Sequence, residues 1–190
     1  MVSIYTPGGG GGGDNAYGRY RQAGSIVHGL GWAGSSNTTL TLVADTLYAS
    51  PILPITTAFN IDALYTFING AAVAGKLGRM GVYADDGTIY PGTLLQDSGT
   101  FAVDAVTDKT VTFTSIALVA NTLYWLVITS DGAPQILRGL RTHLPRGLTV
   151  GGNFFGGVSV ARVFAALPAT FTAGGTSLSD NPIYVGVRRV

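Results

Sequence analysis

Glutamate is absent from this chain of 190 residues, and lysine occurs only at Lys76 and Lys109. Exposed helix faces are built largely from these long charged residues, so the chain lacks the material for ordinary surface helices. Glycine contributes 28 residues, about twice its usual share. Abundant glycine and threonine are typical of turns and strands. The sequence therefore predicts an all-β protein.

Charged residues make up only 11% of the chain, while 46% is hydrophobic and the mean hydropathy is +0.35. A soluble domain usually carries about 25% charged residues. So weakly charged a surface predicts that other protein covers much of it. Because cysteine is absent, we expect neither a disulfide framework nor thiolate chemistry.

Two classes of partner are excluded at this stage. The formal net charge is +1, and although residues 132–190 contain six arginines, these are scattered and lack interleaved lysines. Nucleic-acid-binding proteins carry a denser basic stripe, so we expect no nucleic-acid partner. No run of about 18 apolar residues occurs, so we expect no membrane insertion.

Residues 1–37 differ from the rest and predict an extended N-terminal docking arm. Six consecutive glycines have no side chains to pack and lose much entropy on ordering, so a partner must hold them. A phosphate-binding loop would need a following Lys-Ser/Thr and a helix, which are missing. We expect the arm to bind other protein through its glycines, tyrosines and arginines: Tyr5, Gly8, Gly13, Tyr17, Arg19, Tyr20 and Arg21.

Residues 38–190 predict one sandwich domain of short strands separated by turns. The expected strands are 38–44, 58–68, 77–84, 110–119 and 123–129, with others near 135–140, 158–165 and 182–188. Residues 123–129 are continuously apolar, as in a strand buried on both faces. A short helix near 161–167 is compatible with the pattern. The fold class is an antiparallel, jelly-roll-like β-sandwich with an extended Gly-rich arm.

Alternation within residues 110–119 predicts that Val111, Phe113, Ser115 and Ala117 share one face of their strand.

An internal echo supports related halves within the sandwich. The sequence LVADTLY of residues 42–48 recurs as LVANTLY in residues 118–124. Asp45 and Asn121 occupy the one position that differs, and both residue types tolerate turn conformations. We interpret both segments as a strand, a tight turn and a second strand.

The acidic residues suggest turns rather than catalysis. Asp85, Asp86, Asp97 and Asp131 all lie in predicted turns, and their spacing matches no calcium loop. A glycosidase pair would have to consist of two aspartates, and adjacent ones point apart. Asp97-Ser98-Gly99 is a protease-like tripeptide without the flanking glycines. We expect no catalytic residue, no metal and no cofactor.

Aromatic residues offer binding alternatives. Trp125 lies in the most apolar strand and is expected in the core. Tyr90 precedes Pro91-Gly92 in a loop and is the better candidate for a glycan contact. Phe154 and Phe155 stand between glycine pairs, and we expect them to contact another subunit, with folding back onto the core as the alternative.

Three segments together resemble a β-sandwich module of tailed-bacteriophage virion appendage proteins, found in tail fibres, head fibres and decoration proteins. They are LGRMGVYADDG (77–87), YPGTLLQDSG (90–99) and LYWLV (123–127) followed by SDGAP (130–134). The resemblance spans roughly residues 38–190 and marks the sandwich and its turns, not a site. The N-terminal arm departs from the pattern. The resemblance implies a virion structural role and leaves head or tail open.

The sequence thus predicts a non-enzymatic virion structural protein, assembled in the host cytoplasm and docked to capsid or tail through its arm. Its expected partners are copies of itself, with a trimer favoured, and other virion proteins. The alternative function is a carbohydrate-binding adhesin that recognises host surface polysaccharide. An enzyme ranks third.

Overall fold

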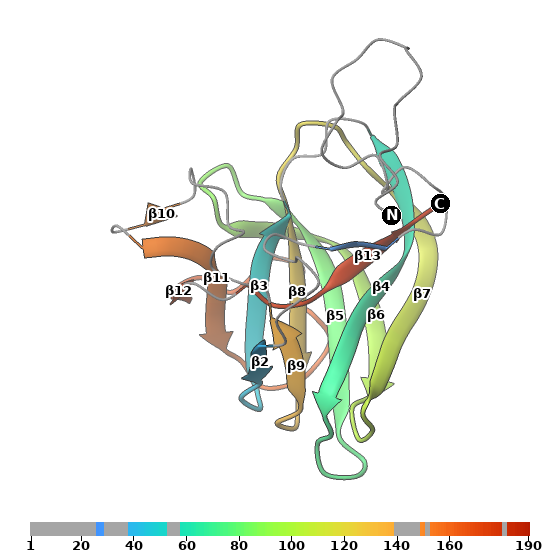
Figure 1. Cartoon of the computed structure of the whole chain (residues 1–190). Coiled ribbons are helices and arrows are strands. Elements are labelled where there is room, and N and C mark those ends of the chain that lie inside the picture. The colour runs from blue at the N-terminus through green and yellow to red at the C-terminus, as the bar shows by residue number, and fades with distance from the viewer. Residues whose placement is uncertain (1–25, 29–37, 53–57, 139–148, 151–152, 180–181) are drawn as a thin grey trace, which may run out of the picture.

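The computed structural model describes residues 26–28, 38–52, 58–138, 149–150, 153–179 and 182–190. Within these ranges all regular structure is β, arranged as two antiparallel sheets packed face to face (Figure 1). The predicted all-β antiparallel architecture is confirmed.

The first sheet has the order β1-β13-β4-β9-β2, and one further strand, β7, pairs with β4. Its strands are β1 (Ile26–His28), β13 (Gly186–Arg189), β4 (Phe59–Gly70), β9 (Gln135–Arg138), β2 (Thr38–Thr41) and β7 (Thr107–Leu118). The second sheet has the order β10-β11-β3-β8-β5-β6, with β12 paired to β11. Its strands are β10 (Thr149–Val150), β11 (Asn153–Ala161), β3 (Thr46–Ile52), β8 (Tyr124–Ser130), β5 (Leu77–Asp85), β6 (Pro91–Ala102) and β12 (Thr176–Ser179).

The strand pairing is nested along the chain. β2 pairs with β9, β3 with β8, β4 with β7, and β5 with β6, all antiparallel. These eight strands therefore pair as the two arms of one long hairpin would. Four of them fall in each sheet, in the orders β2-β9-β4-β7 and β3-β8-β5-β6.

The first sheet includes a strand, β1, that lies before residue 38, where the sandwich was predicted to start. Ile26–His28 belongs to the range assigned to the arm, yet it pairs with β13 from Ile26 opposite Arg188 to His28 opposite Gly186. Its two β-branched residues favour a strand even within a glycine-rich stretch. The sheet region therefore begins before Thr38.

The main core lies between the sheets and draws on both. From the first sheet come Ile61, Leu64, Ile68, Leu118, Ile136 and Val187, and from the second come Tyr48, Ile52, Met80, Val82, Leu126 and Ile128. All are buried. Burial of this apolar area is the main force that holds the two sheets together.

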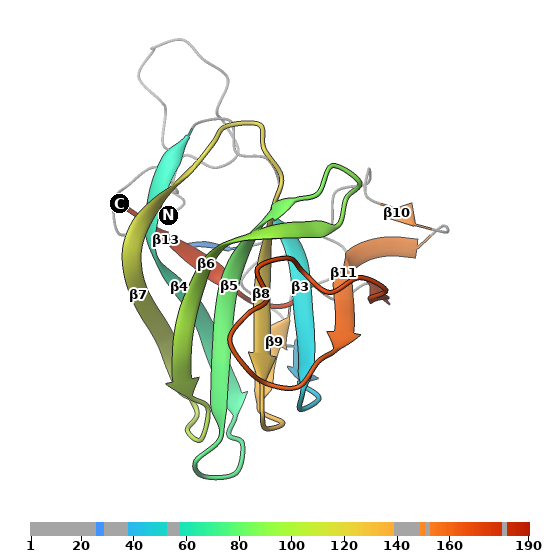
Figure 2. The same ribbon diagram turned by 180° about the vertical axis from the view of Figure 1, so that it is seen from behind.

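A second core covers the outer face of the second sheet. Residues 162–175 run across that face and place Leu167 and Phe171 against Tyr83, Trp125 and other residues of β3, β5, β8 and β11 (Figure 2). Every residue of β8 is buried, because Trp125 and Val127 face this second core while their neighbours face the main one. The prediction of a strand buried on both faces is confirmed.

The covering segment is not helical at 161–167, so the helix considered there is wrong. Its backbone N–H groups bond to other parts of the chain rather than to its own carbonyls. Arg162 N donates to the Asp45 carbonyl at 2.7 Å, and Leu167 N donates to Oδ2 of Asp97 at 3.0 Å. A helix would need those donors for its own i to i−4 bonds.

Residues 42–48 and 118–124, the two echoed segments, each lead from the end of one strand through a tight turn into the start of the next strand, as predicted. We call each of these turns a corner. Asp45 and Asn121 both have φ of 57° and are the turn residues that the sequence analysis singled out. Each corner leads from the first sheet into the second, from β2 into β3 and from β7 into β8. In the β3–β8 ladder, Tyr48 pairs with Ile128 and Ile52 with Tyr124, so a local two-fold axis relates the corners.

A tyrosine closes each corner. The hydroxyl of Tyr48 accepts a hydrogen bond from the Val43 N–H at 3.0 Å, and that of Tyr124 accepts one from the Val119 N–H at 2.8 Å. Both phenol rings are buried in the main core. The seven-residue echo thus encodes one turn geometry twice.

The predicted face of β7 is wrong in its second half. Val111 and Phe113 pack against the main core as expected, but Ser115 and Ala117 are exposed and Ile116 takes over the inward position. The β4–β7 ladder shifts register between these two halves. Such an irregularity changes which residues face the core, and simple alternation cannot anticipate it.

Candidate functional site

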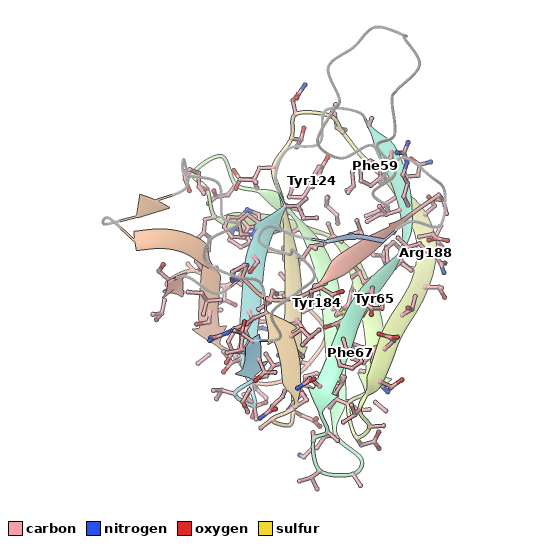
Figure 3. The ribbon with its side chains drawn as sticks, in the orientation of Figure 1. Phe59, Tyr65, Phe67, Tyr124, Tyr184 and Arg188 are labelled. Carbon is pink, nitrogen blue, oxygen red and sulfur yellow. The ribbon has the colours of Figure 1, made fainter. Side chains whose placement is uncertain are left out.

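Three aromatic side chains gather on the outer face of the first sheet, and we call them the aromatic face: Tyr65, Phe67 and Tyr184. Tyr65 and Phe67 alternate along β4 with Leu64 and Ile68, which face the main core, so the two rings point outward. Tyr184 lies just before β13, and its ring meets that of Tyr65 edge to face at 5.8 Å (Figure 3). Phe67 lies further along β4 and is half-buried.

Charged groups border the aromatic face. Arg188 of β13 forms a two-pronged ion pair with Asp62 of β4, with Nε–Oδ1 and Nη2–Oδ2 distances of 2.7 and 2.8 Å. The hydrogen bond from Arg188 lowers the pKa of the Asp62 carboxyl. Beyond this pair, Arg189 lies over the ring of Phe59 at 5.2 Å, a cation–π contact.

The Tyr65 hydroxyl donates a hydrogen bond to Oδ1 of Asp108 on β7. Burial, reinforced by this bond, raises the pKa of the phenol, so Tyr65 remains a protonated donor. Asp108 is exposed beside the rings. Tyr184 is buried, so the accessible part of the aromatic face consists of the half-buried rings of Tyr65 and Phe67 next to Asp108, which suits binding of a ring-shaped polar ligand or of another protein.

Sequence reasoning missed this face. The strand was predicted, and Tyr65 and Phe67 are two residues apart within it. Their outward direction could not be read, because Leu64 and Ile68 on the opposite face are equally apolar. Tyr184 and Arg188 come from β13 and the residues just before it, more than 100 residues later, so only the sheet topology unites them with β4.

Of the four acids assigned to turns, Asp85, Asp86 and Asp131 lie at strand ends or turns as predicted, but Asp97 lies within β6, so its predicted place in a turn is wrong. Asp86 Oδ1 accepts from the N–H and hydroxyl of Thr88, both at 2.7 Å, and these bonds lower its pKa. Asp97 accepts from Arg79 at 2.7 Å and from two backbone N–H groups. Asp131 Oδ1 accepts from the Leu77 N–H at 2.7 Å.

Asp85 connects its turn to the second core. One carboxylate oxygen accepts from the Gly87 N–H at 2.9 Å, and the other accepts from Nε1 of Trp125 at 2.8 Å. Trp125 is fully buried, so its predicted place in the core is confirmed.

Tyr90, the predicted glycan contact, lies at the rim of the second core. Its hydroxyl donates to the Thr172 carbonyl at 2.7 Å and accepts from the Gly175 N–H at 3.0 Å. Its ring is half-buried and meets Phe171 edge to face at 5.8 Å. Tyr90 thus holds the covering segment in place, and any glycan contact must use the remaining ring edge.

The other predicted contacts cannot be placed in the same detail. The arm residues Tyr5, Gly8, Gly13, Tyr17, Arg19, Tyr20 and Arg21 lie outside the described residues. Phe154 and Phe155 belong to β11, but their side chains lie outside the described part of the structure. These assignments stay predictions.

Within the described ranges, no three His, Asp or Glu side chains cluster closely enough to hold a metal ion. The described residues also include no helix with the length and apolar character needed to cross a membrane. No protein-family model matches the chain, and comparison with curated proteins finds no match to it.

Proposed function

We propose that this chain is a non-enzymatic structural protein of a tailed-bacteriophage particle, an appendage, fibre or decoration subunit. Residues 1–37 would dock it to the capsid or tail, apart from β1, which belongs to the sheet. The observation that carries the proposal is the nested strand pairing, β2 with β9 through β5 with β6. A long hairpin rolled into two four-stranded sheets is a jelly roll, an architecture used by viral capsid and lectin domains.

Two further observations support a structural role. The segments that resemble phage appendage modules form β5, β6, β8 and their turns, so they encode a scaffold. The aspartates that could have served catalysis are engaged with backbone groups and with Arg79 and Trp125. Because one fold hosts many functions, the proposal needs a test at the level of the particle.

Deletion of residues 1–21 provides that test, since it ends four residues short of the first described strand, β1. We expect the truncated protein to keep its thermal melting temperature and to be absent from purified particles. A control variant with Gly8 to Gly13 replaced by six serines keeps the length and the tyrosines, and should retain partial incorporation. Incorporation of the truncated protein at the wild-type level would refute docking by the arm.

The second candidate function is binding of host surface polysaccharide, and the aromatic face favours it. Phe67 presents a half-buried ring beside the exposed carboxylate of Asp108, a combination that can stack on a sugar and accept its hydroxyl hydrogen bonds. Glycan binding measured by calorimetry should fall at least about tenfold in Phe67→Ala. Tyr90→Leu, which removes the other candidate ring, should leave binding unchanged; a loss only in Tyr90→Leu would move the site to Tyr90.

A further inference from the structure

Five connecting segments lie side by side at one end of the sandwich. Residues 42–45, 131–134, 71–76 and 103–106 each join one sheet to the other. The matching strand orders of the two sheets place them in that sequence across the molecule. Residues 162–164 follow β11, the neighbour of β3, and extend the row beside 42–45. The row forms the lower end of the molecule in Figure 1.

Short contacts fasten each segment to the next. Backbone hydrogen bonds run from Arg162 N to the Asp45 carbonyl (2.7 Å), from Leu42 N to the Pro134 carbonyl (2.9 Å) and from Ala72 N to the Val103 carbonyl (2.9 Å). The backbone at Gly132 lies so close to Ala72 and Lys76 that a Cβ there would come within 3.1 Å of both. The row is therefore one continuous surface.

This surface is apolar and exposed. Its valines are 75% (Val163), 61% (Val43), 77% (Val73) and 57% (Val106) exposed, and Ala133 is exposed between them in the middle of the row. These valines are four of the eight large apolar side chains that are exposed in the described part of the chain, and they include the two most exposed. We call this surface the valine end. Contiguous apolar surface of this kind marks an interaction site.

Five charged residues lie along the valine end, in the order Arg162, Asp45, Asp131, Lys76 and Asp104. Arg162 lies at one extreme of the row and Asp104 at the other, and neither forms an ion pair with another described residue. Asp45 and Asp131 already accept backbone N–H groups, and Lys76 lies between them and Asp104. When one copy is turned end for end, Arg162 falls opposite the partner's Asp104 and Asp45 falls opposite the partner's Lys76, while Asp131 in the middle segment falls opposite the partner's Asp131. The two pairs of opposite charge make the surface complementary to itself.

We propose that the valine end docks a second copy of this chain, with the two rows antiparallel. In that arrangement Val163 meets the partner's Val106, Val43 meets the partner's Val73, and Arg162 faces the partner's Asp104. Every such contact occurs twice, as in any interface with two-fold symmetry. The proposal is independent of the phage assignment, and it does not use the arm or Phe154 and Phe155.

The two corners supply a matched pair of variants for the test. Val43 and Val119 occupy the same position of the echoed turn and are 61% and 57% exposed, but Val119 lies at the opposite end of the sandwich. Sedimentation of the full chain over a concentration series should show a dimer whose dissociation constant rises at least about tenfold in Val43→Asp. Val119→Asp should sediment like the wild type. Both variants should melt at the wild-type temperature, because both side chains are exposed.

A charge exchange tests the antiparallel register. Arg162→Asp and Asp104→Arg should each weaken the dimer several-fold, because each sets two like charges against one another. The double variant restores opposite charges and should bring the dissociation constant back to within about threefold of the wild type.

Three outcomes would overturn the proposal. The first is a wild-type protein that remains monomeric at about 100 µM, where even an interface of micromolar affinity is populated. The second is equal weakening by Val43→Asp and Val119→Asp, which would indicate a general effect of charge. The third is failure of the double charge variant to recover, which would exclude the antiparallel rows.

Discussion

Replacing Tyr48 and Tyr124 with phenylalanine, singly and together, removes the same hydrogen bond at two separate places in the molecule. Each phenol ring remains in the main core, where both tyrosines are only 5% exposed. Only the hydroxyl that accepts the Val43 or Val119 N–H is lost. The two variants therefore isolate the contribution of the corner hydrogen bond from that of the ring.

The expected cost follows from the surroundings of the orphaned N–H groups. A hydrogen bond contributes about 1 kcal/mol net, and a fully buried orphan donor costs up to about 3 kcal/mol. Because Val43 and Val119 lie in exposed turns, water can reach their N–H groups, and about 1 kcal/mol applies to each variant. At 2–4 °C per kcal/mol, roughly the ratio for domains of this size, each melting temperature should fall by about 3 °C.

The double variant tests whether the corners are independent. The register of β3 and β8 separates the two tyrosines by four residues along the strands, about 13 Å. Sites that far apart usually add, so urea unfolding should show a loss of about 2 kcal/mol in the double variant. A single variant as stable as the wild type, or a double variant that departs from the sum by more than about 0.5 kcal/mol, would refute the shared role of the corners.

Three further predictions address other contacts. Gly157→Ala should cost about 3 kcal/mol or more, because φ is 144° and a Cβ would lie 2.0 Å from a carbonyl oxygen of β3. Gly174→Ala, with φ of 79° and open space around it, should cost only about 1 kcal/mol, and equal losses in the two would count against the clash. Leu167→Ala should cost about 2–5 kcal/mol by opening the second core, whereas Val163→Ala in the same segment should melt like the wild type. The lowered pKa of Asp62 means that its ion pair stabilises the fold above the ordinary carboxyl pKa and is lost as the pH falls through the lowered value. Asp62→Asn should therefore destabilise the protein at neutral pH and lose less further stability than the wild type below about pH 4; parallel pH profiles of the two would contradict this.

The sequence predicted the two corners and the buried strand β8, because the residues within each of these segments determine its structure. Asp45 and Asn121 tolerate a positive φ, so both corners could be predicted from seven residues each. The unbroken apolar run around Trp125 predicted burial on both faces. It could not predict what covers the outer face, because Leu167 and Phe171 are about 40 residues away in the chain.

The errors arose where distant contacts override local pattern. The helix considered at 161–167 fails because Asp45 and Asp97 capture the N–H groups it would need. The face of β7 changes at Ile116 because its ladder with β4 shifts register. The valine end could not be predicted either, since each of its loops has an ordinary sequence and only the topology sets them in a row.

The place of β13 in the first sheet has a consequence for how the protein is made. β13 is the last of the described strands, yet it pairs with β1 on one side and with β4 on the other. While the ribosome is still producing residues before Gly186, β4 has no β13 partner along Ile61–Tyr65. The outer side of the second sheet likewise stays bare until residues 162–175 emerge. Until β13 has been synthesised, the nascent chain must therefore carry exposed apolar strands, which favours aggregation and chaperone capture during that interval.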